Sequence, residues 1–302
     1  MATESELIKA IAQVFASPSN PDIAIGIGDD AAVVRFAAAS SGRGENFAVL
    51  AADMAVEGVH FNRAWSSLFE IGAKITGANL ADIFAMGAKP RYLLVSAALP
   101  EDFTVEQARE LALGIVDEAK KVDAVVVGGD LARSPGNSLV LSLSVMGEVR
   151  DPITRSGAEV GDLVIMSDYP GKSAAGLALL QAGINDERTN EHKRPTINYE
   201  AAREFARAGV SSMIDVSDSL ASELTHLAQA AGVGIEILSD PQMDVHGGED
   251  HIFLATISPH LPMPRYAIEI GRVVLGKGVR MDGVPLIHQG FSHFGDSALD
   301  SL

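Results

Sequence analysis

One feature constrains the fold of this chain most: a short aliphatic run that recurs and ends each time in glycine or aspartate. Such runs cover Asp22–Asp30, Phe47–Asp53 and Val122–Asp130. Their length and β-branched content are typical of strands that are bounded by turns. The pattern therefore predicts strands that end in carboxylates.

Helical patterns lie between these runs, at Leu68–Met86 and Val105–Lys121. The second follows Thr104, and Gln107 stands three residues later, which is the spacing of a capping box. Because strands alternate with helices, the sequence predicts a fold of the α+β or α/β class.

The 302 residues exceed the size of one ordinary core and favour two domains. Asp151-Pro152 and the turn-rich segment after it interrupt the pattern, so we predict domains at 1–150 and 151–302. A strand is predicted at Leu163–Ser167. The polar stretch Asn185–Asn198 is predicted to be a surface excursion.

Composition excludes several classes of function. Lys plus Arg number 23 against 40 Asp plus Glu, and the net charge of −17 disfavours nucleic acid and anionic lipid as partners. The absence of cysteine excludes disulfides, thiolate catalysis and Cys-ligated zinc. No export signal or apolar run long enough to span a membrane occurs, so a cytoplasmic protein is expected.

Carboxylates gather at the predicted junctions: Asp53, Asp82, Asp130, Asp215 and Asp218. Singly, each is better explained as a helix cap or a solvated acid. Asp82 differs because it lies within an apolar helix, where an unpaired carboxylate would cost several kcal/mol. Oxygen ligands from separate strand ends are what Mg²⁺ prefers, and Mg²⁺ commonly binds substrate phosphates. Together the acids indicate metal-assisted phosphoryl transfer.

Three glycine-containing segments match known motifs only in part. Gly26–Ala31 fits a dinucleotide fingerprint, but a strand pattern follows it and its two acids would repel phosphate. Gly171–Ser173 lacks the leading glycine of a Walker A loop, because position 166 is Met166. A strand-to-helix turn explains Gly171–Ser173 better than a phosphate loop does. His246–His251 matches no zinc motif, although Gly247 and Gly248 could aim the acids that follow.

Many segments, in order along the chain, resemble the thiamine-monophosphate kinase family of the aminoimidazole-ribonucleotide-synthetase-like superfamily. They are GIGDDAA from Gly26, DMAVEGVHF from Asp53, GANLADIFAMGAKP from Gly77, VVGGD ending at Asp130, TRSGAEVGD from Thr154, GKSAAGLALL from Gly171, IDVSDSL from Ile214, GGED from Gly247 and GFSHF from Gly290.

The resemblance implies an α+β fold with two domains and a homodimer in which the N-terminal domains pair through their sheets. It also implies direct in-line transfer of the γ-phosphoryl group of ATP to thiamine monophosphate. The magnesium ligands implied by position are Asp30, Asp53, Asp82, Asp130, Asp215 and Asp218. The implied ATP contacts are Gly129, Asp130, Arg155 and Ser217, and the implied contacts to the thiamine phosphate are His60, Glu249 and Phe291.

The chain departs from the family pattern at several positions. Ala51 and Ala52 replace hydroxyl residues that help to ligate metal, so one metal site is expected to be weak or absent. The other departures are Leu131, Ser219, His251 and a shortened stretch at 239–246. Two alternatives to the kinase therefore stay open: a paralogue that binds nucleotide or thiamine phosphate without turnover, and a related ATP-dependent synthetase of the superfamily.

Overall fold

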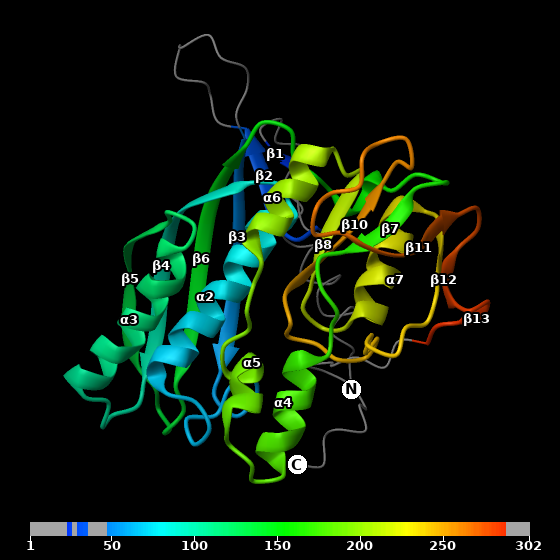
Figure 1. The fold of residues 1–302 in the computed structure, drawn as a ribbon. Coiled ribbons are helices and arrows are strands. Elements are labelled where there is room, and N and C mark those ends of the chain that lie inside the picture. The colour runs from blue at the N-terminus through cyan, green and yellow to red at the C-terminus, as the bar shows by residue number, and fades with distance from the viewer. Residues whose placement is uncertain (1–22, 26–28, 36–46, 288–302) are drawn as a thin grey trace.

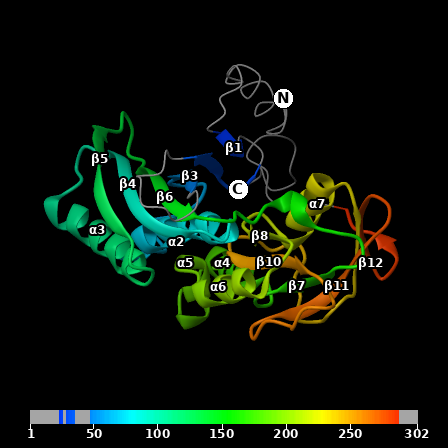
Figure 2. The same cartoon turned by 90° about the horizontal axis from the view of Figure 1, so that it is seen from above.

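The computed structural model describes residues 23–25, 29–35 and 47–287. Two sheets stand side by side with helices packed between and around them (Figure 1). This is the α+β architecture that the sequence predicts. The same two layers are seen from above in Figure 2.

The first sheet has six strands in the order β1-β2-β3-β6-β4-β5, and only the β4–β5 pair is parallel. Helices α2 and α3 cover one of its faces (Figure 1). The elements are β1 (Ile23–Ile25), β2 (Ala32–Arg35), β3 (Phe47–Val56), α2 (Leu68–Ala85), β4 (Lys89–Leu99), α3 (Val105–Lys120), β5 (Val125–Arg133) and β6 (Val140–Val149).

The two long helices begin where the sequence predicts. Ser67 forms a capping box with Glu70 at the start of α2, and Thr104 forms one with Gln107 at the start of α3. The helices pack with their backbones in close approach. A Cβ added at Gly114 would lie 1.9 Å from the carbonyl oxygen of Phe69, so only glycine fits there.

The second sheet has seven strands in the order β13-β12-β9-β11-β7-β10-β8. Its strands are β7 (Leu163–Met166), β8 (Ser212–Val216), β9 (Gly234–Ile237), β10 (Ile252–Ile257), β11 (Ile268–Val274), β12 (Gly278–Met281) and β13 (Val284–Pro285). The helices of this half are α4 (Lys172–Gln181), α5 (Asn190–Lys193), α6 (Tyr199–Ala208) and α7 (Leu220–Ala231), with short 3-10 turns at Arg155–Gly157 and Glu187–Thr189.

Strand β8 is buried on both faces, and its alternation orients one of the predicted site residues. Ile214 and Val216 belong to the core under α7, whereas Met213 belongs to the core shared with α2 and α6. Because side chains alternate along a strand, Asp215 lies on the same face as Met213. The strand therefore directs this carboxylate toward the first half of the chain.

The surface excursion predicted at Asn185–Asn198 holds for its exposed first residues, 185–188, but is wrong for most of the rest. This segment contains α5 and packs against α4 and α2, with Thr189, His192 and Lys193 buried. Its polar residues are satisfied internally; for example, the Oγ of Ser173 lies 3.1 Å from the Nδ1 of His192. Composition alone did not reveal this packing.

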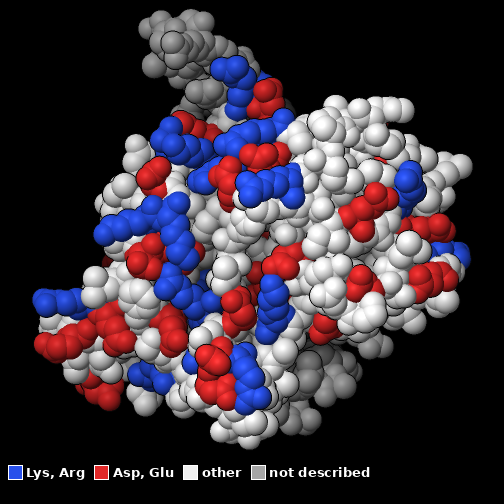
Figure 3. Space-filling model, in the orientation of Figure 1, with Lys and Arg blue, Asp and Glu red and all other residues white. Residues whose placement is uncertain are grey.

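Acidic and basic side chains are interspersed over the face shown in Figure 3, despite the net charge of −17. In the part of the chain that the structure describes, no helix is long and apolar enough to cross a membrane.

Candidate active site

A cavity of about 630 Å³ lies where α2 and β3 face elements of the second half of the chain. Those elements are the start of α4, helix α5, the turn after β8 and the glycine-containing loop before β10. Residues from both halves of the chain therefore form its walls.

Helix α2 forms one wall along its length. The lining residues Ile71, Lys74, Ile75, Ala78 and Asp82 recur at spacings of three and four, so they form one stripe on the helix. The stripe spans roughly 16 Å, at about 1.5 Å per residue. It changes from apolar at the start of the helix to acidic near its end.

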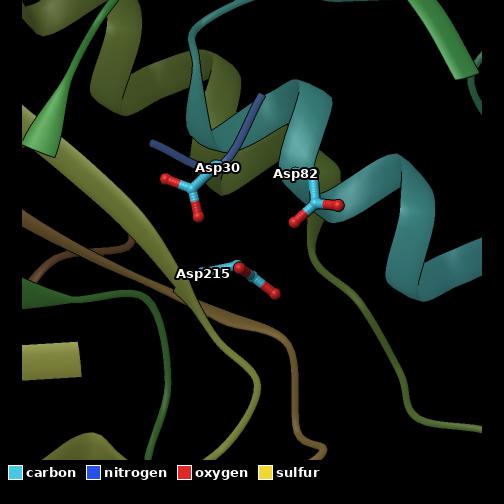
Figure 4. Close-up of side chains that lie close together, drawn as sticks. All are labelled: Asp30, Asp82 and Asp215. Atoms are coloured by element: carbon cyan, nitrogen blue, oxygen red, sulfur yellow. The ribbon is translucent and has the colours of Figure 1, made fainter. Parts of the chain in front are cut away.

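At the acidic end, oxygens of Asp30, Asp82 and Asp215 lie within 4.8 Å of one another. Figure 4 shows these carboxylates pointing toward one another from the turn before β2, from α2 and from β8. The sequence separates these residues widely, and the fold brings them together.

The electrostatics of this cluster favour a bound cation. Burial raises the pKa of Asp30 to about 8, although Arg155 opposes the shift. Burial, reinforced by repulsion from Asp53 and Asp215, holds the pKa of Asp82 well above its usual range. Arg155 and His251 each pair with one of the three carboxylates. The three oxygen donors, held this close together, still fit a hard divalent cation such as Mg²⁺.

Asp53 lies next to the cluster. Its backbone N–H donates to the Oδ1 of Asn79 on α2 at 3.1 Å, and its side chain lines the cavity. Burial and then the charge of Asp215 raise its pKa, against a smaller opposing effect of His251. Ser217 and Asp218 line the same cavity from the turn after β8.

Asp130 is not part of this cluster. It is exposed on β5, and the strand register aligns it with Ser96, whose side chain faces away from α2. Asp53 is on the helix-covered side of β3, three strand spacings or roughly 14 Å away.

Gly129 also lies outside the cavity. A Cβ at Gly129 would come 1.8 Å from the carbonyl oxygen of Val95, so close strand pairing explains this glycine.

Arg155 faces carboxylates and does not line the cavity. Its Nη2 donates to Asp30 Oδ1 at 2.7 Å and its Nε to Asp30 Oδ2 at 3.2 Å. This fork holds Asp30 beside the other acids. A nucleotide phosphate could bind the guanidinium of Arg155 only alongside the carboxylate of Asp30, which already accepts two of its hydrogen bonds.

The loop before β10 completes the cluster side of the cavity. A Cβ at Gly248 would lie 2.2 Å from the carbonyl oxygen of Asp218, so glycine lets the loop pack against the turn after β8. Glu249 and His251 take φ values of 61° and 49°, an uncommon conformation for residues with a Cβ. The Nδ1 of His251 lies 2.9 Å from Oδ2 of buried Asp215.

The other end of the cavity combines apolar and polar side chains. Lys74 Nζ lies 3.0 Å from Glu249 Oε1 and donates to the carbonyl oxygen of His60 at 3.1 Å. His192 Nδ1 lies 3.5 Å from Glu249 Oε2, and its ring meets that of Trp65 edge-on with centroids 6.5 Å apart. His60 and Glu249 are the contacts that the family resemblance implies, whereas Lys74, Trp65 and His192 were not predicted.

The histidines at this end differ in their bonding. Burial, with Lys74 adding to it, lowers the pKa of His192 to about 4, so this ring is neutral at pH 7. His60 accepts the backbone N–H of Val56 at Nδ1, which assigns the proton of a neutral ring to Nε2. Phe291 lies outside the described residues.

The Gly171–Ser173 turn has its amides already occupied. Asp250 accepts the backbone N–H of Gly171 at 2.6 Å and that of Ser173 at 2.9 Å. The carboxylate thus occupies the position that a phosphate would take at the start of α4, which agrees with a plain strand-to-helix turn.

Comparison with known proteins places this site in a family. Residues 28–149 match the family of the AIR synthase related protein, N-terminal domain, and residues 159–259 match its C-terminal domain. The thiamine-monophosphate kinase of Mycobacterium tuberculosis is 35% identical over 91% of this chain and 87% of that protein. That of Aquifex aeolicus is 32% identical over 89% of this chain and 92% of that protein.

The chain belongs to the thiamine-monophosphate kinase family.

Solved structures agree with this membership. AaThiL complexed with AMPPCP and TMP matches with a TM-score of 0.83 at 30% identity, over 97% of both chains. The hydrogenase maturation protein HypE in complex with ATP matches with a TM-score of 0.66 at 15% identity, which shows a common fold alone.

The departures from the thiamine-monophosphate kinase pattern lie at different places in the structure. Ala52 lines the cavity, and His251 pairs with Asp215. Leu131 is exposed on β5, and Ser219 caps α7 by accepting the backbone N–H of Ser222. The changes at Ala52 and His251 therefore affect the site directly.

Proposed function

We propose that this protein transfers the γ-phosphoryl group of ATP to the phosphate of thiamine monophosphate, giving thiamine diphosphate and ADP. The observation that carries the proposal is the buried cluster of Asp30, Asp82 and Asp215 at the acidic end of a cavity whose other end combines apolar side chains with Lys74 and Glu249. The AaThiL complex with AMPPCP and TMP supports the two substrates.

The residues that would hold magnesium are those of the cluster, with Asp53 and Asp218 beside them. Magnesium there would neutralise negative charge on the phosphates during transfer. Asp130, Gly129, Arg155 and Ser217 remain proposed contacts to ATP, and Asp130 also remains a proposed metal ligand. Of these four, only Ser217 lines the cavity.

The rest of the mechanism is positioning by this chain. The acceptor is a phosphate that is already ionised, so in-line attack on the γ-phosphoryl group requires no general base. His60 and Glu249 are proposed to hold the acceptor, and the stripe on α2 orients it along the cavity. The catalytic contribution of the protein is then to align two anions and to compensate their charge.

We further propose a homodimer that forms through the face of the first sheet that no helix covers. This face exposes large apolar side chains from three strands: Leu50, Met54, Tyr92, Leu94, Val125 and Val127. A patch of this kind marks an interaction surface, and its self-complementary partner would be a second copy of the chain. The domain division at residue 151 and a cytoplasmic location are also part of the proposal.

The second candidate is a protein that binds these ligands without turnover. It is favoured by Ala51 and Ala52, which offer no hydroxyl beside Asp53. The experiment incubates purified protein with thiamine monophosphate, ATP and Mg²⁺, with EDTA as the control. Stoichiometric, metal-dependent thiamine diphosphate and ADP would support the kinase, and binding of both ligands without product would support the second candidate.

A further inference from the structure

Lys74 is an unusual cation in this structure. It lies in the middle of the α2 stripe, and its side chain is only 10% exposed. Among the described residues that line the cavity, no other is a lysine or an arginine. His192 adds no charge, because its pKa is lowered to about 4 by burial and then by Lys74. A phosphate that enters the cavity therefore meets one side-chain cation of permanent charge.

The position of Lys74 along α2 suits an acceptor phosphate. Ile71 precedes it by one turn, toward the start of the helix, and Trp65, which meets the ring of His192, lines the same cavity. Asp82 follows it by two turns, about 12 Å along the helix axis. A ring bound at the apolar end would therefore place a phosphate on its chain near Lys74, on the side that faces the acidic cluster.

Lys74 and Glu249 form an ion pair inside the cavity, with 3.0 Å between Nζ and Oε1. Burial acts to raise the pKa of Glu249, but the opposing interactions, led by the charge of Lys74, outweigh it, so the pKa is lowered and the carboxylate is ionised. The two charges compensate each other. A ligand with one anionic and one cationic group could replace this pair without leaving either charge uncompensated.

We propose that Lys74 binds the phosphate of the acceptor and that its ion pair with Glu249 opens when the acceptor enters. The phosphate forms an ion pair with Lys74 in place of Glu249. Glu249 then pairs with the cationic ring system of the acceptor. Lys74 thereby makes the cavity select a phosphorylated acceptor over its unphosphorylated form. This inference rests on the proposed function, since it takes thiamine monophosphate as the acceptor.

Trp65 supplies a probe for the test. It is the only tryptophan in the chain, and it lines the apolar end of the cavity. Its fluorescence therefore reports occupancy of that end. Thiamine monophosphate and thiamine are titrated separately in Mg²⁺ without ATP, so that no turnover occurs, and the two dissociation constants are compared as a ratio.

Lys74→Met is expected to weaken binding of thiamine monophosphate by about tenfold to a hundredfold, the usual effect of losing a charge-assisted hydrogen bond. The dissociation constant for thiamine should not rise, because thiamine carries no phosphate for Lys74 to bind and its ring no longer competes with Lys74 for Glu249. Lys193→Met is the matched control, because Lys193 is also 10% exposed but does not line the cavity. It should leave both constants unchanged.

Lys74→Met leaves Glu249 buried without its cation, so the double variant Lys74→Met/Glu249→Gln is measured as well. Loss of the preference for thiamine monophosphate in both variants supports the inference. A preference kept in either folded variant overturns it while leaving the proposed function intact. Failure of the wild-type protein to bind either ligand contradicts both.

Discussion

The Nδ1 atom of His251 lies 2.9 Å from Oδ2 of Asp215, and both side chains are buried. Burial acts to lower the pKa of His251, but the hydrogen bond and charge of Asp215 outweigh it and raise the pKa. Since Asp215 is one of the three clustered carboxylates, His251 fixes the orientation of a proposed magnesium ligand.

We therefore expect His251→Phe to weaken magnesium binding by about tenfold or more, as is usual when the partner of a ligand is lost. His251→Asn can keep a hydrogen bond to Asp215 and should retain most of the affinity. The measurement is the Mg²⁺ concentration at half-maximal activity, with direct Mg²⁺ titration by calorimetry. Equal affinities in the wild type and His251→Phe would show that Asp215 needs no such support.

The cluster should make the metal-free protein less stable as the pH rises. The pKa of Asp30 is about 8 in the folded protein against an ordinary 3.8. Between these values the folded state holds a proton that the unfolded state releases, so the free energy of unfolding falls as the pH increases through this window. Urea denaturation in EDTA from pH 5 to about pH 8 measures the slope.

Asp82→Asn should flatten that slope and raise the stability of the metal-free protein near neutral pH, because it removes a buried carboxylate whose pKa is raised. The same variant should lose turnover. Added Mg²⁺ should stabilise the wild type and have little effect on Asp82→Asn. A variant that is less stable than the wild type in EDTA would contradict the electrostatic account of the cluster.

The contact between α2 and α3 depends on Gly114, where an added Cβ would lie 1.9 Å from the carbonyl oxygen of Phe69. We expect Gly114→Ala to lower the free energy of unfolding by about 1–3 kcal/mol, the usual cost of overpacking. Gly136→Ala is the control, because a Cβ there meets nothing within 4 Å. Similar denaturation midpoints for the two variants would show that the helices separate without cost.

The proposed dimer predicts that the wild type sediments as a dimer and that Leu94→Glu sediments as a monomer. Leu94 is 49% exposed on the open face of the first sheet, where a charge would oppose pairing. Leu275→Glu is the control, since Leu275 is 89% exposed on the other half of the chain. A monomeric wild type, or a dimer that persists in Leu94→Glu, would exclude this face as the interface.

Local signals in the sequence predicted much of the fold. The capping box at Thr104 and the helical periodicity placed α3 to within one residue, and the strand predicted at Leu163–Ser167 forms as β7, Leu163–Met166. Strand β4 was not predicted, although it pairs with both β6 and the edge strand β5 of the first sheet. Its residues Lys89–Leu99 mix charged, aromatic and apolar side chains, and its pairing with β5 and β6 comes from distant segments.

The candidate site could be predicted only where residue type determines the chemistry. Asp82 was identifiable because a carboxylate within an apolar helix needs a partner. Asp53 and Asp130 lie on opposite faces of the sheet. Which face each side chain takes depends on the strand register, and the pairing of β4 with β5 includes a bulge that the sequence does not reveal. Lys74 and His192 owe their place to packing between distant segments, and the spacing of the lining residues on α2 was the one signal that could have revealed Lys74.

We propose that the carboxylate cluster supports transfer of a phosphoryl group from ATP to thiamine monophosphate. The most direct measurement gives the protein thiamine monophosphate and ATP labelled in its γ-phosphate, with Mg²⁺, and follows the label. We predict label in the terminal phosphate of thiamine diphosphate for the wild type and none for Asp82→Asn. Wild-type protein that binds both substrates but leaves the label in ATP would contradict the account.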